Sequence, residues 1–293
     1  MPVKWYWDKI QTMKHTALIF LTLICFACRN KKSFSFLDDQ SQVLASTIAQ
    51  PKVKFGVEGF YTGRYGAEKR EGNKKAYDKK ITICIDSLNE SKLFGHSIIG
   101  GTDRPFSGPY KKMGKLYEVS ASEPGDNRYD GNFIFTIDAP HHLLKGNWSA
   151  NNTNLSVLKS EFELKEKPYK YESALRLPDL FSGLPLFDSK EEDKYETLTE
   201  DVLKFNPSIT LLKSADIEKM YHADLEVLRN SIYARHGFSF LNKRMRILFD
   251  NVNWYMPVTT NVTPLLTEVE KKNIVLIKRY EANAEKYYEA FSR

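Results

Sequence analysis

The chain has 293 residues, enough for two ordinary domains, and 42% of them are hydrophobic, which excludes a wholly disordered protein. Its formal charge of +6 is modest and its basic residues are spread along the sequence, which argues against a nucleic-acid-binding protein. Of the three cysteines, Cys25 and Cys28 lie near the N-terminus, so Cys84 has no partner in the remaining chain and a disulfide framework is excluded.

The N-terminal segment contains a mainly apolar run at residues 17–27, preceded by Lys14. This run is shorter than the roughly 20 residues of a transmembrane helix, but it is typical of a signal-peptide core. Ala27 stands directly before Cys28, and this arrangement resembles the lipobox of bacterial lipoproteins. The resemblance implies a signal peptide of residues 1–27 and lipidation of Cys28, with acyl chains such as palmitate holding the protein on a membrane. An ordinary signal peptide or short anchor is the alternative.

Residues 28–54 are predicted to form a tether between this lipid anchor and the first folded domain. Lys31 and Lys32 add attraction to anionic lipid headgroups. The basic character of this segment favours an anchor that faces the periplasm over one on the cell surface. Met13 also begins a signal peptide of ordinary length, so both Met1 and Met13 are candidate translation starts.

Residues 55–165 alternate apolar and polar side chains in short runs, and this period of two indicates antiparallel strands. Turn-forming sequences such as Ser107-Gly108-Pro109 and Asp130-Gly131-Asn132 separate the runs. We therefore predict a small antiparallel barrel or sandwich. The predicted strands lie at 59–63, 80–85, 92–98, 116–119, 133–137, 143–148 and 161–164.

Two short motifs in this β-domain, one at residues 59–63 and one at 146–148, resemble strands of lipocalin- or avidin-like barrels. Such a barrel implies a mouth that can take one small ligand. The alternative, which we favour, is a closed barrel that Tyr61, Phe135 and Trp148 fill. Cys84 lies within an alternating apolar run and is predicted to be a small buried core residue, not a nucleophile.

Residues 166–210 contain four prolines, and the acid-rich stretch 188–201 is predicted to be a solvated linker, not a metal site. From residue 211 onward the apolar period becomes helical, so 211–293 is predicted to be mostly helical. Ser214 is the expected N-cap of the first helix. Thr267 and Glu270 have the spacing of a capping box at the start of the last helix.

The run Tyr233-Ala234-Arg235-His236-Gly237 resembles the signature of the YARHG domain family. The resemblance extends over about 70 to 80 residues and includes Phe238, Phe240, Trp254-Tyr255 and the segment 266–274. It implies a mostly helical extracytoplasmic domain, found in bacterial envelope proteins that are often lipoproteins. This agrees with the export signal at the other end of the chain.

The YARHG motif has two interpretations. In the structural one, which we favour, Gly237 takes a left-handed helix-end conformation and the helix end packs on Trp254. In the functional one, a site for a carboxylate, phosphate or peptide terminus is formed by Arg229, Tyr233, Arg235 and His236.

Other residue clusters predict no metal or cofactor site. His141 and His142 lack a correctly spaced third ligand. Asp126, Asp130 and Gly131 lack the ligand series of a calcium loop, so a hairpin turn is preferred.

These observations predict an α+β protein, with an N-terminal antiparallel β-barrel or sandwich and a mostly helical C-terminal domain. The expected function is non-enzymatic: a lipid-anchored bacterial cell-envelope protein that binds peptidoglycan or an envelope protein, and no nucleic acid. The alternatives are a small-ligand-binding β-barrel lipoprotein and a hydrolase with an unrecognised nucleophile.

Overall fold

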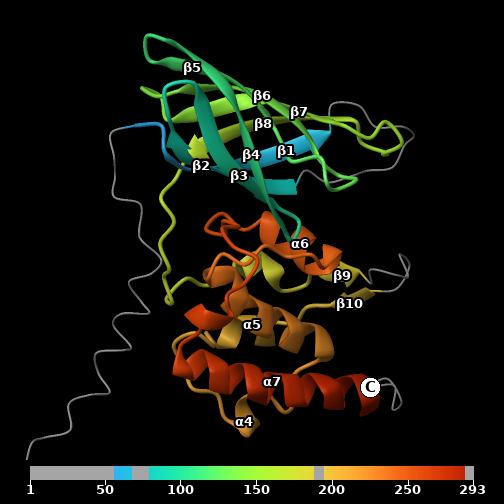
Figure 1. The fold of residues 1–293 in the computed structure, drawn as a ribbon. Coiled ribbons are helices and arrows are strands. Elements are labelled where there is room, and N and C mark those ends of the chain that lie inside the picture. Colours follow the sequence, from blue (N-terminus) through green and yellow to red (C-terminus); the bar gives the residue numbers. More distant parts are fainter. Residues whose placement is uncertain (1–55, 68–78, 188–194, 288–293) are drawn as a thin grey trace, which may run out of the picture. The chain divides into compact units, whose positions relative to one another are not determined.

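The computed structural model describes residues 56–67, 79–187 and 195–287. The predicted signal peptide, Cys28 and the tether lie outside these described residues. Within them, an antiparallel β-barrel is followed by a largely helical region, which confirms the predicted α+β class (Figure 1). No helix in these ranges combines the length and the apolar character needed to cross a membrane.

The barrel is a meander in which each strand pairs with the next, and β8 closes on β1. The structure contains every predicted strand and adds β4, so the prediction of a turn at Ser107-Gly108-Pro109 is wrong. Gly108 and Pro109 lie within β4, and a side chain at Gly108 would collide with the carbonyl oxygen of Ser120 on β5. The strands are β1 Gly59–Ala67, β2 Lys79–Leu88, β3 Lys92–Ile99, β4 Thr102–Met113, β5 Leu116–Ser122, β6 Gly131–Asp138, β7 Leu143–Ala150 and β8 Lys159–Glu166.

Side chains fill the interior of the barrel. The ring centroid of Phe133 lies 5.1 Å from that of Phe106, in a tilted arrangement, and 6.1 Å from that of Phe162, in an edge-to-face arrangement. Rings packed in the interior favour the filled barrel over the small-ligand-binding alternative. The buried cluster comprises Val57, Tyr61, Ile81, Ile83, Ile85, Leu93, Phe106, Val119, Ala121, Phe133, Phe135, Ile137, Leu144, Trp148, Phe162 and Leu164.

The region after the barrel is built around one helix, α5, which contacts α7, α6 and α3 (Figure 1). It also contains a two-stranded antiparallel sheet of β9 and β10. The elements are η1 Asp179–Phe181, β9 Pro185–Phe187, β10 Tyr195–Thr197, α3 Asp201–Lys204, α4 Ser214–Ile217, α5 His222–Arg235, α6 Lys243–Asp250, η2 Thr263–Leu265 and α7 Glu268–Tyr287.

Much of the predicted linker belongs to the core of this helical region. Its apolar residues have neither a helical nor a strand period, so the pattern did not reveal their burial. Part of the acidic stretch, 188–194, lies outside the described residues. The segment supplies Leu177, Phe181, Leu186, Leu198 and Val202 to a cluster with residues of α5 and α6.

The helix ends are stabilised by polar side chains. The predicted capping box is confirmed: the Thr267 amide donates to Glu270 Oε2 at 2.9 Å, and the Glu270 amide donates to Thr267 Oγ1 at 3.3 Å. The prediction that Ser214 caps the first helix is wrong, because Ser214 is already helical. The Asp216 carboxylate instead accepts from the amide of the preceding residue, Lys213, at 2.7 Å.

Candidate functional site

The YARHG residues form the C-terminal end of α5. The helix ends there because Gly237 has a φ of +70°, a conformation that side chains disfavour. A Cβ at this position would also collide with Val258 and approach the carbonyl oxygen of Met256 to 2.9 Å. Tyr233 is half-buried and its ring lies 6.0 Å from that of Phe238. The chain therefore reverses tightly at Gly237 and brings the next segment against the helix end.

Arg235 is buried and binds a segment that precedes the helix by about 60 residues. Its Nε donates to the carbonyl oxygen of Leu175 at 2.8 Å, and its Nη1 donates to Ser231 Oγ at 2.8 Å. Its guanidinium lies 5.8 Å from the ring of Trp254, within cation–π range. Burial lowers the pKa of Arg235 to about 10, so the side chain stays charged at neutral pH.

The segment 167–176 is fixed to the helix end by two further hydrogen bonds. The Tyr169 hydroxyl donates to the carbonyl oxygen of Arg235 at 2.9 Å. Trp254 Nε1 donates to the carbonyl oxygen of Arg176 at 2.8 Å. The Tyr169 and Trp254 side chains thus satisfy backbone carbonyls of the helix end and of this segment.

His236 points to the other side of the helix end and is also buried. Its Nε2 lies 2.8 Å from Glu270 Oε2, and its ring stacks on Tyr171 with 4.2 Å between centroids. The Tyr171 hydroxyl donates to Glu270 Oε1 at 3.0 Å. Burial opposes ionisation of Glu270, but the hydrogen bonds from His236 and Thr267 outweigh it and lower the pKa of this carboxyl. The motif, α7 and the segment before η1 therefore meet at one carboxylate.

The four residues predicted to bind an anion do not converge on one point. Arg229 Nε donates to both carboxylate oxygens of Glu281 at 2.9 Å, and its guanidinium lies 5.9 Å from the Tyr233 ring. Arg235 and His236 are engaged with Leu175 and Glu270, as described above. An external anion would compete with two carboxylates of the chain itself. No sequence motif marks Tyr171, Leu175 or Glu281 as contacts of the YARHG residues. The sequence indicates Glu270 only as a capping residue.

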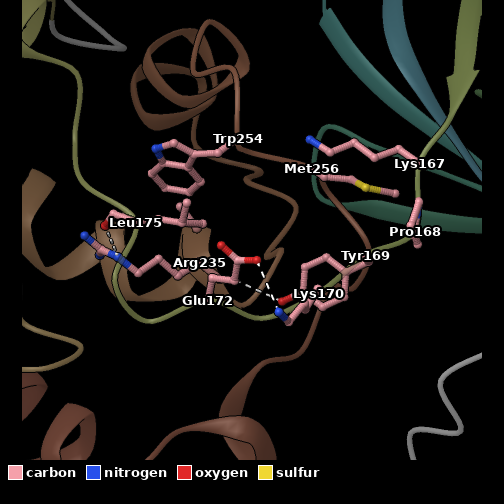
Figure 2. Close-up of a pocket in the computed structure, with 10 residues that line it drawn as sticks. Lys167, Pro168, Tyr169, Lys170, Glu172, Leu175, Arg235, Trp254 and Met256 are labelled. Atoms are coloured by element: carbon pink, nitrogen blue, oxygen red, sulfur yellow. Dashed lines mark hydrogen bonds and ion pairs between the residues drawn. The ribbon is translucent and has the colours of Figure 1, made fainter.

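A cavity of about 140 Å³ opens beside Arg235. Figure 2 shows Trp254, Leu175 and Arg235 on one side of it and Met256, Lys167 and Pro168 on the other. The Lys170 side chain is 75% exposed and forms a 3.6 Å ion pair with Glu172. This volume is below the roughly 300–1,000 Å³ of small-molecule sites, so the cavity suits one side-chain-sized group. The lining residues are Lys167, Pro168, Tyr169, Lys170, Glu172, Leu175, Ala234, Arg235, Trp254 and Met256.

The other clusters considered in the sequence have internal partners. Asp130 accepts from Arg104 Nε at 3.1 Å and from the Gly125 amide at 2.9 Å, so a guanidinium neutralises the suspected calcium loop. His141 pairs with Asp138 at 2.8 Å, whereas His142 pairs with Glu166 at 2.6 Å. The two adjacent histidines therefore do not share a ligand site.

Comparison with protein-family models finds a match to the YARHG domain at residues 208–282. This segment is a YARHG domain. The prediction made from the motif is confirmed, and the domain indicates an extracellular or cell-envelope protein. A search of curated proteins finds no match. The YARHG match includes Arg235, Trp254 and Met256, but the lining residues within 167–175 precede it.

Proposed function

We propose that the protein is a non-enzymatic, lipid-anchored protein of the bacterial cell envelope that faces the periplasm and binds peptidoglycan or an envelope protein. Support comes from the YARHG domain at residues 208–282 and from the lipobox-like sequence before Cys28. The observation that carries the binding proposal is the cavity between Trp254 and the segment 167–175, with lysines beside an apolar floor.

The chemistry of the cavity favours a group with a short apolar body and a negative end. Trp254, Leu175 and Met256 offer apolar surface. Lys167, Lys170 and the paired Glu172 leave a net positive charge among the side chains at the rim. Lysine ammonium groups form strong hydrogen bonds with carboxylates. Peptide stems of the cell wall and acidic side chains of envelope proteins both carry such carboxylates. The buried guanidinium of Arg235 reinforces the positive potential at the floor.

The alternatives receive less support. The interior of the barrel is occupied by its own side chains, which opposes a small-ligand-binding barrel. A hydrolase would need a nucleophile with a base in hydrogen-bond reach. The tyrosine in the cavity wall, Tyr169, instead donates to a backbone carbonyl, and burial raises the pKa of its hydroxyl.

Co-sedimentation with purified cell-wall sacculi tests the proposal. The full chain, purified in mild detergent, is compared with the double variant Lys167→Glu/Lys170→Glu and with Lys219→Glu. Lys219 is an exposed lysine of the YARHG domain outside the cavity, so its variant shows the effect of one charge reversal elsewhere on the surface. We expect saturable binding by the parent chain and a loss of about tenfold or more in the double variant, equivalent to about 1.4 kcal/mol.

Substitution of Arg235 or His236 is a poor test because both side chains are buried and hold the fold together. No binding by the parent chain contradicts wall recognition and leaves an envelope protein as the partner to seek by crosslinking. Equal binding by the parent and the Lys167→Glu/Lys170→Glu variant contradicts the cavity as the site. Circular dichroism of each variant establishes that it is folded.

A further inference from the structure

Cys84 and His96 face each other across neighbouring strands of the barrel. They are paired positions in the β2–β3 register. Ile83 and Ile85, on either side of Cys84, belong to the buried barrel interior, and Cys84 does not. Because side chains alternate along a strand, the thiol lies on the outer face of the sheet. Cys84 is buried as predicted, but it is not part of the apolar core.

A β-bulge in β2 adds a third polar side chain to this pair. Ile85 pairs with Gly95 and Ser87 pairs with Phe94, so Asp86 is the extra residue between them. Bulges re-aim a side chain and occur often beside functional sites. Here the Asp86 carboxylate lies 3.3 Å from Cys84 Sγ and 3.0 Å from His96 Nδ1.

We propose that Cys84, Asp86 and His96 bind a divalent transition-metal ion of the zinc class through Sγ, a carboxylate oxygen and Nδ1. The three ligand atoms lie within 4.8 Å of one another. Tetrahedral zinc ligands at 2.0–2.3 Å from the ion are about 3.3–3.7 Å apart, so small side-chain adjustments close the site. A mixed set of thiolate, imidazole and carboxylate suits zinc better than magnesium or calcium, which prefer oxygen ligands alone.

The surroundings allow an ion to enter and to be held. The side chains of Asp86 and His96 are 46% and 25% exposed, whereas Cys84 is 9% exposed. The ion would therefore enter from solvent past Asp86 and His96 and bind the less exposed Cys84 thiolate at the inner side of the site. Asp103, on the neighbouring strand β4, adds negative potential to the site.

The same barrel offers a matched control for this site. His141 also lies beside an aspartate, with its Nδ1 2.8 Å from Asp138, but it forms no three-ligand cluster of the kind found at Cys84 among the described residues. A metal that binds any histidine–aspartate pair on the surface would bind there too. Metal affinity that depends on His96 but not on His141 therefore distinguishes a specific site from weak surface binding.

Cobalt(II) titration of the full chain provides the test, because a cobalt–thiolate bond gives a charge-transfer absorption in the near ultraviolet. The parent for this experiment carries Cys25→Ser and Cys28→Ser, so Cys84 is its only thiol. We expect about one equivalent of cobalt with this absorption and with tetrahedral bands in the visible, and displacement by zinc bleaches both. Cys84→Ser abolishes the charge-transfer band, His96→Gln weakens binding by about tenfold or more, and His141→Gln changes neither.

Absence of the charge-transfer band in the parent overturns the proposal, as does a band that survives Cys84→Ser. Circular dichroism without metal shows whether each variant is folded. If Cys84→Ser does not fold, Asp86→Asn decides, because this side chain is half-exposed and its loss spares the barrel interior. Unchanged cobalt affinity in Asp86→Asn then overturns the site, and weakened affinity supports it.

Discussion

The barrel and the helical region satisfy their buried backbone groups in different ways. In the barrel, the continuous ladder from β1 to β8 and back to β1 pairs the backbone, and the interior is apolar. The helical region contains long irregular segments, so side chains supply the missing partners. Asn273, for example, donates to the carbonyl oxygens of Pro207 and Thr210 at 2.7 Å and accepts from the Leu212 amide at 2.9 Å. Irregular backbone can be buried only where polar side chains are buried with it.

Glu123 is the buried carboxyl of the barrel that allows a direct comparison with Glu270. It accepts from the Gly131 amide at 2.7 Å and from Trp148 Nε1 at 3.1 Å. Burial nevertheless raises the pKa of Glu123, whereas the pKa of Glu270 is lowered. The surroundings of Glu270 therefore stabilise a buried negative charge, whereas those of Glu123 disfavour one.

The largest expected effect is the loss of stability when Glu270 is replaced. Glu270→Gln should lower the free energy of unfolding by about 3 kcal/mol, because His236 and the Thr267 amide lose a charged partner in a buried site. Glu123→Gln keeps the shape and removes a disfavoured charge, so it should cost less than about 1 kcal/mol at neutral pH. Urea denaturation of the two variants measures both values, and equal costs would contradict the distinction between these two carboxyl sites.

The second prediction compares two glycines with positive φ, Gly237 in the YARHG motif and Gly125 in the barrel, at +70° and +84°. An added Cβ meets Val258 and Met256 at Gly237, but it meets nothing within 4 Å at Gly125. Gly125→Ala should therefore cost only the backbone strain, about 1 kcal/mol, while Gly237→Ala should cost about 2 kcal/mol or more. Thermal unfolding of the two variants measures the difference. A smaller cost at Gly237 would show that the reversal after α5 is not tightly packed.

The smallest expected effect concerns Glu196, which contacts Arg244 and His222. Burial alone would raise the pKa of Glu196, but hydrogen bonds from these two side chains outweigh it and lower the pKa from 4.5 to about 2. A lowered pKa gives stability that is present above pH 4.5 and is lost as the pH falls toward 2. Because the side chain is 38% exposed, solvent screening reduces its contribution to less than about 1 kcal/mol.

The check is the pH dependence of unfolding for the parent chain and Glu196→Gln. The variant should be slightly less stable at pH 7 and should lose less stability between pH 4.5 and 2. Parallel curves for the two proteins would mean that Arg244 and His222 do not hold this carboxylate in its charged form.

Most strand positions could be predicted because half-buried strands leave a period of two in the sequence, and the YARHG motif identified the helical domain. The strand β4 was missed because Gly108 and Pro109 are residues typical of turns. Closure of the barrel could not be predicted, because it depends on the pairing of β1 with β8, which are separated by about a hundred residues of sequence. The burial of Leu177 and Phe181 was missed because their segment has no period.

The contacts of the motif residues were equally hidden from sequence reasoning. His236 and Glu270 are 34 residues apart, and Arg229 and Glu281 are 52 apart. Each pair meets only because α5 packs against α7. The cluster at Cys84 depends on a bulge at Asp86, and alternation alone does not reveal where an extra residue enters a strand.

The bonds of Arg235 and His236 to the segment 167–176 also bear on where this domain can be cut from the chain. The YARHG match begins at residue 208, yet Tyr169, Tyr171 and Leu175 all lie before it. A fragment that starts at residue 208 would expose the buried guanidinium of Arg235 and would remove Tyr171, on which the His236 ring stacks. A fragment that keeps these contacts must therefore start at or before Tyr169, well ahead of the first residue of the family match.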